Sequence, residues 1–379
     1  MNYSKLYNFA VESYAKLPYR FGNGKAFRPL SLFVELTYRC NFRCNMCQFL
    51  TMLDDPRLNE KKGEELTTDE INRVVDQISG LGLIVFTGGE PLLRKDIMEL
   101  TRHAARRHKV YLVTNGILLK EEMADEFVRL GCGTLLSRGM ASVGISLEAL
   151  GPRHDEIVQV PGSFEKIMGN VRHFVAAKKR AGKTFPLVWL KCVITSHNVA
   201  MLDDMYALAG EAGVDMFNPI TYYGIPATDR LAMLDKIAPD TPPVPADRFD
   251  VAELRRQLEK MRLREQRSKV QLRITPPGLT DDDVLAVYEG RLDMGNKACY
   301  TPWSSAALSA YGDVFPCSNY TVGNIRQTPF MKLWNNEKMV KFRRELKERK
   351  IFKSCAACCS MVYEGQPSSY PPLSPPPAG

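Results

Sequence analysis

The sequence predicts an α/β fold: a partial, TIM-like barrel of six parallel β/α units, followed by a small C-terminal domain that carries cysteines. Three observations predict it. Short apolar runs alternate with segments in which apolar residues recur every three or four positions, as in parallel β/α units. Polar clusters follow the runs one after another, and the active sites of such barrels lie where strands end. The composition changes again at Cys299.

Composition limits the classes of function. The 379 residues suffice for about two domains. No apolar run is long enough to span a bilayer, and no signal segment opens the chain, so we expect a cytoplasmic protein. Ten cysteines at short spacings suit metal ligation in a reducing compartment better than disulfides. The net charge of +8 indicates either a solvated basic surface or docking of an acidic reductant of the flavodoxin or ferredoxin type. The sequence has no basic stretch interleaved with aromatics, so nucleic acid is not the expected partner.

The elements follow in chain order. An apolar stripe at helical spacing predicts a helical extension over residues 1–30 that packs on the outside of the barrel. The barrel is expected over residues 31–225, with strands at 32–36, 83–86, 110–113, 143–147, 187–194 and 215–220. Helices are expected at 67–78, where a capping box opens the segment, and at 95–107, 119–130, 164–179 and 199–212.

Three cysteines follow the first strand within eight residues, at Cys40, Cys44 and Cys47. Thiolates in so tight a loop can all reach one metal centre. A structural zinc site normally shows two pairs of ligands. A 4Fe–4S cluster takes thiolates on its irons, and three cysteines leave one iron for a non-protein ligand. A zinc knuckle, or three unrelated thiols, is the alternative.

This spacing resembles the signature of the radical S-adenosylmethionine (radical SAM) superfamily. The resemblance implies that S-adenosylmethionine chelates the open iron and is cleaved reductively to a 5′-deoxyadenosyl radical, which abstracts a hydrogen atom from the substrate. The chemistry then belongs to the cofactor, and the protein supplies binding, orientation and exclusion of water.

The polar clusters after the strands resemble the motifs with which this superfamily binds S-adenosylmethionine. The stretch Gly88-Gly89-Glu90 is similar to the segment that contacts the methionine amino group, and two glycines let backbone approach a ligand closely. A tight turn is the alternative. The same resemblance implies that Asn115, Ser146 and Glu148 also bind the cofactor, and we expect Met46 to pack on its adenine.

Two departures from the family pattern stand out. Glu148 replaces the commoner aspartate near the ribose. The arginine often found after the His154-Asp155 pair is missing, because Val158 and Gln159 occupy that region. Arg153 is nearby, but its position does not match, so the role is not carried over to it.

Residues 226–298 are predicted to form a proline-rich linker and a helix with a narrow apolar stripe, and the stripe indicates core packing or a dimer contact. From residue 299 to 360, two distant thiols and a C-x2-C pair supply four metal ligands: Cys299, Cys317, Cys355 and Cys358. Zinc fits that count as well. The layout resembles the SPASM/twitch extension of radical SAM enzymes, which implies one auxiliary 4Fe–4S cluster. Residues 361–379 are predicted to be a disordered, proline-rich tail.

No side chain is marked by its spacing as the catalytic acid or base. Cys359 is left over as a spare ligand or a hydrogen donor. Cys132 and Cys192 are further candidates for hydrogen donation, although lone cysteines are more often small core residues.

We therefore expect a radical SAM oxidoreductase with an auxiliary cluster as electron acceptor. The first expectation for the substrate is a carbohydrate or aminocyclitol-like small molecule, because the layout resembles that of an aminocyclitol dehydrogenase. Thirty N-terminal residues are also too few for the leader-recognition domain that often precedes peptide-modifying barrels. The alternatives are a peptide or protein maturase and, in another class, a non-catalytic metal-bound scaffold.

Overall fold

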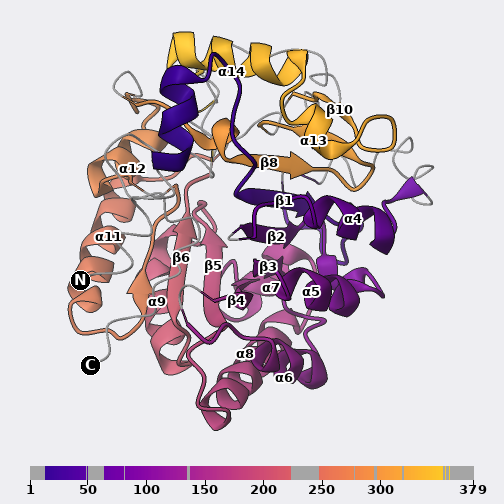
Figure 1. Cartoon of the computed structure of the whole chain (residues 1–379). Coiled ribbons are helices and arrows are strands. Elements are labelled where there is room, and N and C mark those ends of the chain that lie inside the picture. The colour runs from indigo at the N-terminus through magenta and orange to yellow at the C-terminus, as the bar shows by residue number, and fades with distance from the viewer. Residues whose placement is uncertain are drawn as a thin grey trace.

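One sheet of ten strands organises the molecule (Figure 1). The structure, a computed structural model, describes residues 13–47, 49, 64–80, 82–134, 137–222, 247–276, 278–293, 297–317, 320–352, 355 and 358. Seven strands run parallel in the order of the chain: β1 (Ser31–Glu35), β2 (Leu83–Thr87), β3 (Lys109–Thr114), β4 (Gly139–Ser146), β5 (Leu187–Val193), β6 (Met216–Ile220) and β7 (Gln271–Leu272). The partial barrel of six β/α units is confirmed, and β7 extends it at the β6 edge.

The central strands are apolar along most of their length because both of their faces are covered. In β3 and β5 every residue but one or two is buried. Near-continuous apolar runs of this kind are typical of parallel strands. All six predicted strands are present, and β4 begins four residues before the predicted run, at Gly139.

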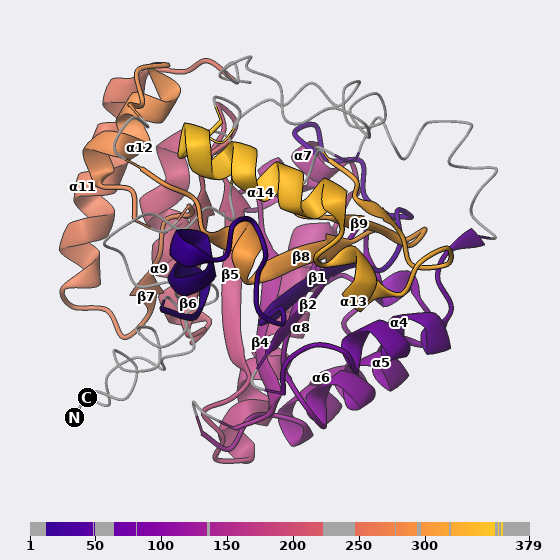
Figure 2. The same cartoon turned by 45° about the horizontal axis from the view of Figure 1, so that its top comes forward.

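Helices cover the outer face of the sheet (Figure 2). They are α4 (Thr68–Val75), α5 (Ile97–Ala105), α6 (Glu121–Arg129), α7 (Pro152–Val158), α8 (Ser163–Arg180), α9 (Leu202–Glu211), α11 (Val251–Glu265) and α12 (Asp281–Tyr288), with 3-10 turns η2 (Pro91–Leu93) and η3 (Val199–Met201). The predicted capping box at the start of α4 is confirmed, since Thr67 and Glu70 exchange hydrogen bonds. The apolar stripe of α11, at Leu254, Leu258 and Met261, is buried against the rest of the chain, so core packing is confirmed.

The C-terminal segment continues the same sheet at its other edge. β8 (Ser305–Leu308) follows the short turn η4 (Thr301–Trp303) and pairs parallel with β1. β9 (Asp313–Phe315) and β10 (Gly323–Asn324) then add antiparallel strands. These strands have two to four residues each, too few to show a periodicity, so the sequence did not predict them.

Two helices follow these strands, α13 (Phe330–Leu333) and α14 (Glu337–Arg349), and Asn336 caps the start of α14. Residues 13–21 form a helix that lies beside α14 in both views (Figures 1 and 2). The Lys347 Nζ donates to the Arg20 carbonyl at 2.9 Å, and Arg344 donates to the Asn23 carbonyl. Most of the predicted N-terminal stripe, the linker at 226–246 and the tail lie outside the described residues.

Candidate active site

The cysteine loop leaves the carboxyl end of β1 and is held from two sides. On one side the turn after β2 meets it. The Gly89 N–H donates to the Thr37 carbonyl at 2.7 Å, and the Glu90 N–H donates to the Arg39 carbonyl at 2.8 Å. The chain thus reaches Cys40 along the polar edge where the strands end.

The two glycines are required by this contact. Gly88 has a φ of +132°, a conformation that favours glycine, and a Cβ on it would overlap the Thr37 carbonyl oxygen. A Cβ on Gly89 would overlap the Arg39 carbonyl oxygen. The sequence predicted close approach of a ligand here; the described close approach is that of the cysteine loop's own backbone.

The Glu90 side chain joins the turn after β2 to the end of β3. Its Oε1 accepts from the Leu92 N–H at 2.9 Å and from the Thr114 hydroxyl at 2.7 Å, while its Oε2 accepts from the Asn115 N–H at 2.7 Å. Burial raises the pKa of the Glu90 carboxyl above its ordinary value, and the bonds from Asn115 and Thr114 oppose that shift. Each carboxylate oxygen has two lone-pair sites, so the Oε2 keeps room for one more donor, such as an amine. The Asn115 side chain also donates to Asn41 at 2.8 Å.

The three thiols of the loop lie close enough to affect one another. Burial, followed by the charge of Glu148 and of the two other thiols, raises the pKa of Cys44 well above its ordinary range. Burial also raises the pKa of Cys40. The Phe42 N–H donates to the Cys40 sulfur and the Phe49 N–H to the Cys47 sulfur, each at 3.4 Å. Buried thiolates need nearby positive charge, and N–H···S bonds are among the features that tune iron–sulfur clusters, so this donor set suits such a cluster.

Helix α7 holds the loop from the second side. The Arg43 N–H donates to the Val158 carbonyl at 3.1 Å, and the Asn45 N–H donates to the Ile157 carbonyl at 3.2 Å. The Gln159 side chain donates to the Arg43 carbonyl and to the Asn45 side chain. The region in which an arginine is missing is therefore used here to fix the cysteine loop.

Glu148 lies beyond the end of β4 and is buried. Its Oε2 accepts from the Val193 N–H at 2.9 Å, and burial raises the pKa of its carboxyl to about 7. The turn around it is fixed by His154, whose Nδ1 accepts from the Glu148 N–H at 3.0 Å, and by Asn198, which donates to the Glu148 carbonyl at 2.7 Å. Glu148 influences the pKa of Cys44, so the structure brings it to the cysteine loop.

Ser146 and Met46 are half-buried, whereas Arg153 is exposed. Ser146 is the last residue of β4 and is half-buried. Met46 is half-buried and packs against the main core. Arg153 is 43 % exposed and pairs with Glu156 at 2.7 Å, so it lies on the surface.

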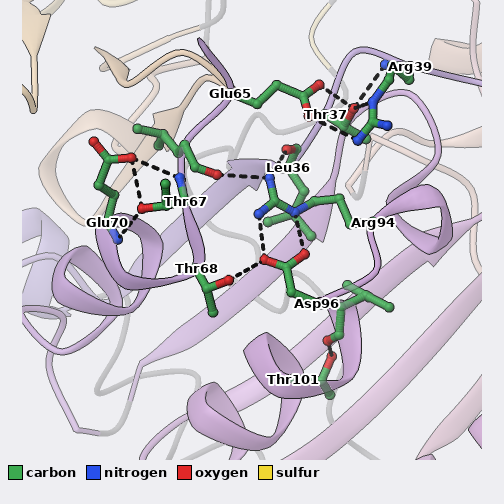
Figure 3. Close-up of polar contacts among 12 residues, drawn as sticks. Leu36, Thr37, Arg39, Glu65, Thr67, Thr68, Glu70, Arg94, Asp96 and Thr101 are labelled. Carbon is green, nitrogen blue, oxygen red and sulfur yellow. Dashed lines mark hydrogen bonds and ion pairs between the residues drawn. The ribbon is translucent and has the colours of Figure 1, made fainter. Parts of the chain in front are cut away.

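A polar network anchors the start of the cysteine loop (Figure 3). Glu65 accepts from the Thr37 hydroxyl at 2.5 Å and from Arg39 at 3.1 Å. Buried Arg94 donates to the Leu36 carbonyl at 3.1 Å and to the Leu66 carbonyl at 3.0 Å, and it pairs with Asp96 at 2.6 Å. The network joins the end of β1 to the segment before α4. No spacing signal in the sequence marks Glu65 or Arg94.

The second cysteine group is also assembled. Burial raises the pKa of Cys355 well above its ordinary range, and the thiols of Cys299 and Cys317 add to that shift, so the three lie near one another. The Cys358 N–H donates to the Cys355 carbonyl at 2.9 Å, and Cys358 packs against the main core. In the described part of the chain, no three Cys, His, Asp or Glu side chains are arranged to hold a single metal ion. The assignment of ligands therefore rests on chain position and on these electrostatic contacts.

Neither described candidate hydrogen donor lies at the carboxyl end of the strands on the face turned away from the helices, although burial and then the charge of Glu148 raise the pKa of Cys192. Cys192 points to the core between the sheet and the helices, whereas Trp189 and Val193 lie on the opposite face of β5. Cys132 precedes β4 and bonds to Met140, at the amino end of the strands, opposite the cysteine loop. Their placement disfavours both as donors. Cys359 lies outside the described residues.

Comparison with protein-family models gives two matches. The model of the radical SAM superfamily matches residues 34–191, which span the barrel from β1 to β5. The model of an iron–sulfur cluster-binding domain, SPASM, matches residues 299–359, which include all four cysteines of the second group. Together the two matches contain both cysteine groups.

Curated relatives match over most of their length. An AdoMet-dependent heme synthase of Methanosarcina barkeri is 26 % identical over 352 residues, which is 87 % of this chain and 90 % of that protein. A PqqA peptide cyclase of Xanthomonas campestris is 28 % identical over 330 residues, which is 83 % of this chain and 76 % of that protein.

Solved structures share the fold. Streptococcus suis SuiB bound to its precursor peptide SuiA has a TM-score of 0.63 at 15 % identity, with 92 % of this chain and 76 % of that chain covered. The enzyme anSMEcpe with bound AdoMet and a peptide has a TM-score of 0.55 at 18 % identity, with 91 % and 98 % covered. No described helix is long and apolar enough to cross a bilayer.

Proposed function

We propose that this chain, a radical SAM protein with a SPASM iron–sulfur domain at residues 299–359, modifies a peptide by abstracting a hydrogen atom from carbon. Its cofactors are S-adenosylmethionine and 4Fe–4S clusters, which supply a reactive carbon radical when bound. The observation that carries the proposal is the gathering of Cys40, Cys44 and Cys47 beside Glu90 and Glu148 at the carboxyl end of the barrel.

Different residues at the carboxyl end of the barrel would bind the cluster and the parts of S-adenosylmethionine. Cys40, Cys44 and Cys47 would ligate three irons, and the N–H groups of Phe42 and Phe49 would stabilise two of the sulfurs. Glu90 would accept the methionine ammonium, since its Oε2 keeps room for a donor. Glu148 would accept ribose hydroxyls, and Ser146, Asn115 and Met46 would line the same cofactor.

The four cysteines Cys299, Cys317, Cys355 and Cys358 would ligate one auxiliary cluster. Four thiolates leave no iron open, so this site suits transfer of an electron better than binding of substrate. A substrate that has lost a hydrogen atom and then a proton still carries one electron more than its oxidised product, and the auxiliary site would accept it. Net oxidation is therefore the outcome that we propose.

The relatives favour the peptide over the carbohydrate that the sequence analysis placed first. PqqA peptide cyclase is a relative by sequence, and two matched structures hold peptides, SuiB with SuiA and anSMEcpe with Cp18Cys. None of the relatives reported above is named for a carbohydrate. A tetrapyrrole is the second candidate, because the heme synthase aligns with 90 % of its own length.

One experiment distinguishes the two substrate classes. The protein, purified and reconstituted without oxygen, is incubated with S-adenosylmethionine and dithionite. One sample receives short precursor peptides encoded near the gene, and another receives a carboxylated porphyrinogen. We expect 5′-deoxyadenosine in both samples and the mass loss of two hydrogens in a peptide alone. Loss from the tetrapyrrole alone would replace the first proposal by the second. A protein that releases no 5′-deoxyadenosine would be the non-catalytic scaffold.

The electron donor is proposed on charge alone. A chain of net charge +8 would attract an acidic flavodoxin or ferredoxin, and such donors suit the reducing cytoplasm that the cysteine content favours. If the rate at which the donor reduces this protein falls steeply as the salt concentration is raised, such docking is supported.

A further inference from the structure

Lys191 is a buried cation on the inner face of the barrel, the face that is turned away from helices α4–α9. It stands in β5 between Leu190 and Cys192, which point to the helices, so it lies on the same face as Trp189, which packs with Tyr111 on the inner face. Only 7 % of Lys191 is exposed. Strands β1–β6 hold one other lysine, Lys109 at the amino end of β3, and no arginine or histidine.

The neighbouring strands leave room for this side chain to cross the inner face. Gly144 lies between the two on β4, and a Cβ there would stand 2.8 Å from the Lys191 Cδ and 2.5 Å from the Tyr111 hydroxyl. The Lys191 Nζ then lies over the Tyr111 ring, 5.6 Å from its centroid. A cation–π contact orients an ammonium group but uses none of its three N–H donors.

No described residue accepts a hydrogen bond or forms an ion pair with the Lys191 Nζ within the 4.0 Å limit of a salt bridge. Glu148 is close enough for the charge of Lys191 to lower its pKa, but the two do not form an ion pair. In register Lys191 pairs with Ser146 and Asn218, so its backbone is level with the strand ends at which the cysteine loop lies. Burying an ammonium group is costly unless an anion pairs with it.

The other cations near the site are engaged elsewhere. Arg153 pairs with Glu156 on the surface, Arg94 is held by Asp96 and two carbonyls, and Arg43 donates to carbonyls of its own loop. Where an arginine is missing, Val158 is buried and Gln159 binds the loop. Lys191 is therefore the described side chain best placed to meet an anion inside the barrel.

We propose that Lys191 is an anion-binding residue that takes a carboxylate on the inner face of the barrel. Two carboxylates come within its range if the proposed function holds. One is the methionine carboxylate of S-adenosylmethionine, whose ammonium group Glu90 would bind. The other is an acidic group of the substrate, such as a glutamate side chain of a peptide or a carboxylate of a tetrapyrrole, bound deeper over Tyr111.

The first arm of the test measures cofactor binding to the cluster-loaded protein. The dissociation constants of S-adenosylmethionine and of decarboxylated S-adenosylmethionine are compared for the wild type and for Lys191→Met, which keeps the length of the side chain but not its charge. If the cofactor is the source, Lys191→Met weakens binding of S-adenosylmethionine at least about tenfold, as expected for loss of a buried ion pair. Binding of the decarboxylated form stays unchanged.

The second arm uses bromide as a probe in crystals of the protein with S-adenosylmethionine bound. If the carboxylate that Lys191 binds belongs to the substrate, Lys191→Met leaves the affinity for S-adenosylmethionine unchanged. Anomalous density for bromide is then present at the Lys191 Nζ in the wild type and absent in the variant. Unchanged cofactor affinity without bromide at the Nζ overturns the proposal, and so does a carboxylate of this chain paired with Lys191 in those crystals.

Lys109→Met is the matched control. Lys109 is as buried as Lys191, but it lies at the amino end of β3. Its substitution should therefore change neither the affinity for S-adenosylmethionine nor the bromide density at Lys191. Iron content separates failure of this proposal from failure of the proposed function. A wild type that holds its iron and binds S-adenosylmethionine leaves the function standing, whatever Lys191 does.

Discussion

At the scale of single residues, the cysteine loop takes its course from two positions that have no side chain. Gly88 and Gly89 let the turn after β2 lie against the Thr37 and Arg39 carbonyls. The obstruction to a Cβ there is backbone, which cannot move aside as a flexible side chain can. The glycine pair therefore acts on the cysteines through the loop, in addition to any contact with the cofactor.

Gly89→Ala should displace the cysteine loop and lower iron loading at the first cluster. We expect reconstituted iron to fall from about eight per chain toward about four, because the second group of cysteines lies on other segments of the chain. Gly210→Ala is the control, since a Cβ at Gly210 meets nothing within 4 Å. Full iron loading of Gly89→Ala would show that the loop does not depend on this close approach.

His154 should make the protein sensitive to acid. Burial lowers the pKa of the imidazole to about 4, from 6.5, so the folded state holds it neutral while the unfolded chain takes up a proton. Its contribution to stability is present above pH 6.5 and is lost as the pH falls toward 4. Between pH 7 and pH 5, urea unfolding of the metal-free wild type should lose about 2 kcal/mol more than that of His154→Gln. Equal losses in the two proteins would contradict this assignment.

Sequence reasoning marks the candidate ligands but not the residues that support them. Cysteine spacing marks Cys40, Cys44 and Cys47 without any knowledge of the fold, and the structure brings their thiols together. Lys191, Arg94 and Glu65 carry no such mark, because one charged residue in a strand or turn is indistinguishable from a surface charge until the fold is known. Alternation in β5 is the one signal that could have placed Lys191 on the inner face.

At the scale of elements, the site depends on where the strands stop. The ends of β1, β2, β3 and β4 converge through Glu90, Asn115 and the cysteine loop, while α7 presents carbonyls to the loop from the other side. The polar clusters that the sequence analysis singled out lie at those strand ends. The contacts between them join residues 24 to 116 positions apart, so no local pattern could have revealed them.

Arg94 should be the main support of the junction between β1, η2 and α4 (Figure 3). Arg94→Met leaves Asp96 without its partner and two carbonyls without a donor, and it should lower the free energy of unfolding by about 3 kcal/mol. Arg102→Met serves as the control, because its pair with Glu126 is half-exposed and should be worth less than about 1 kcal/mol. Equal effects in urea unfolding would remove this role from Arg94.

At the scale of the whole molecule, the two cysteine groups share one sheet. β8 pairs with β1, so the C-terminal segment begins beside the strand that leads to Cys40. Arg326 pairs with Glu70 at 2.7 Å and donates to the Glu64 carbonyl at 2.8 Å, and the Leu66 N–H donates to the Ala310 carbonyl at 2.8 Å. The Arg326 hydrogen bond lowers the pKa of Glu70 to about 2. The C-terminal segment thus braces the strand-end network from outside.

This continuity was not predictable from composition. The change at Cys299 correctly indicates a second cysteine-bearing region, and the SPASM match begins at that residue. The short strands of this region have too few residues for a pattern, and β1, with which β8 pairs, lies more than 200 positions away. A sequence can thus predict two cysteine-bearing regions, but only the fold shows that they form one sheet.

The central claim is that the two cysteine groups hold two separate clusters and that only the first begins the chemistry. The measurement is iron content together with 5′-deoxyadenosine release in two anaerobically reconstituted variants, one with alanine at Cys40, Cys44 and Cys47 and one with alanine at Cys355 and Cys358. We predict about four irons in each, with release of 5′-deoxyadenosine only from the second. Release from the first variant, or zinc in place of iron at either group, would contradict the account.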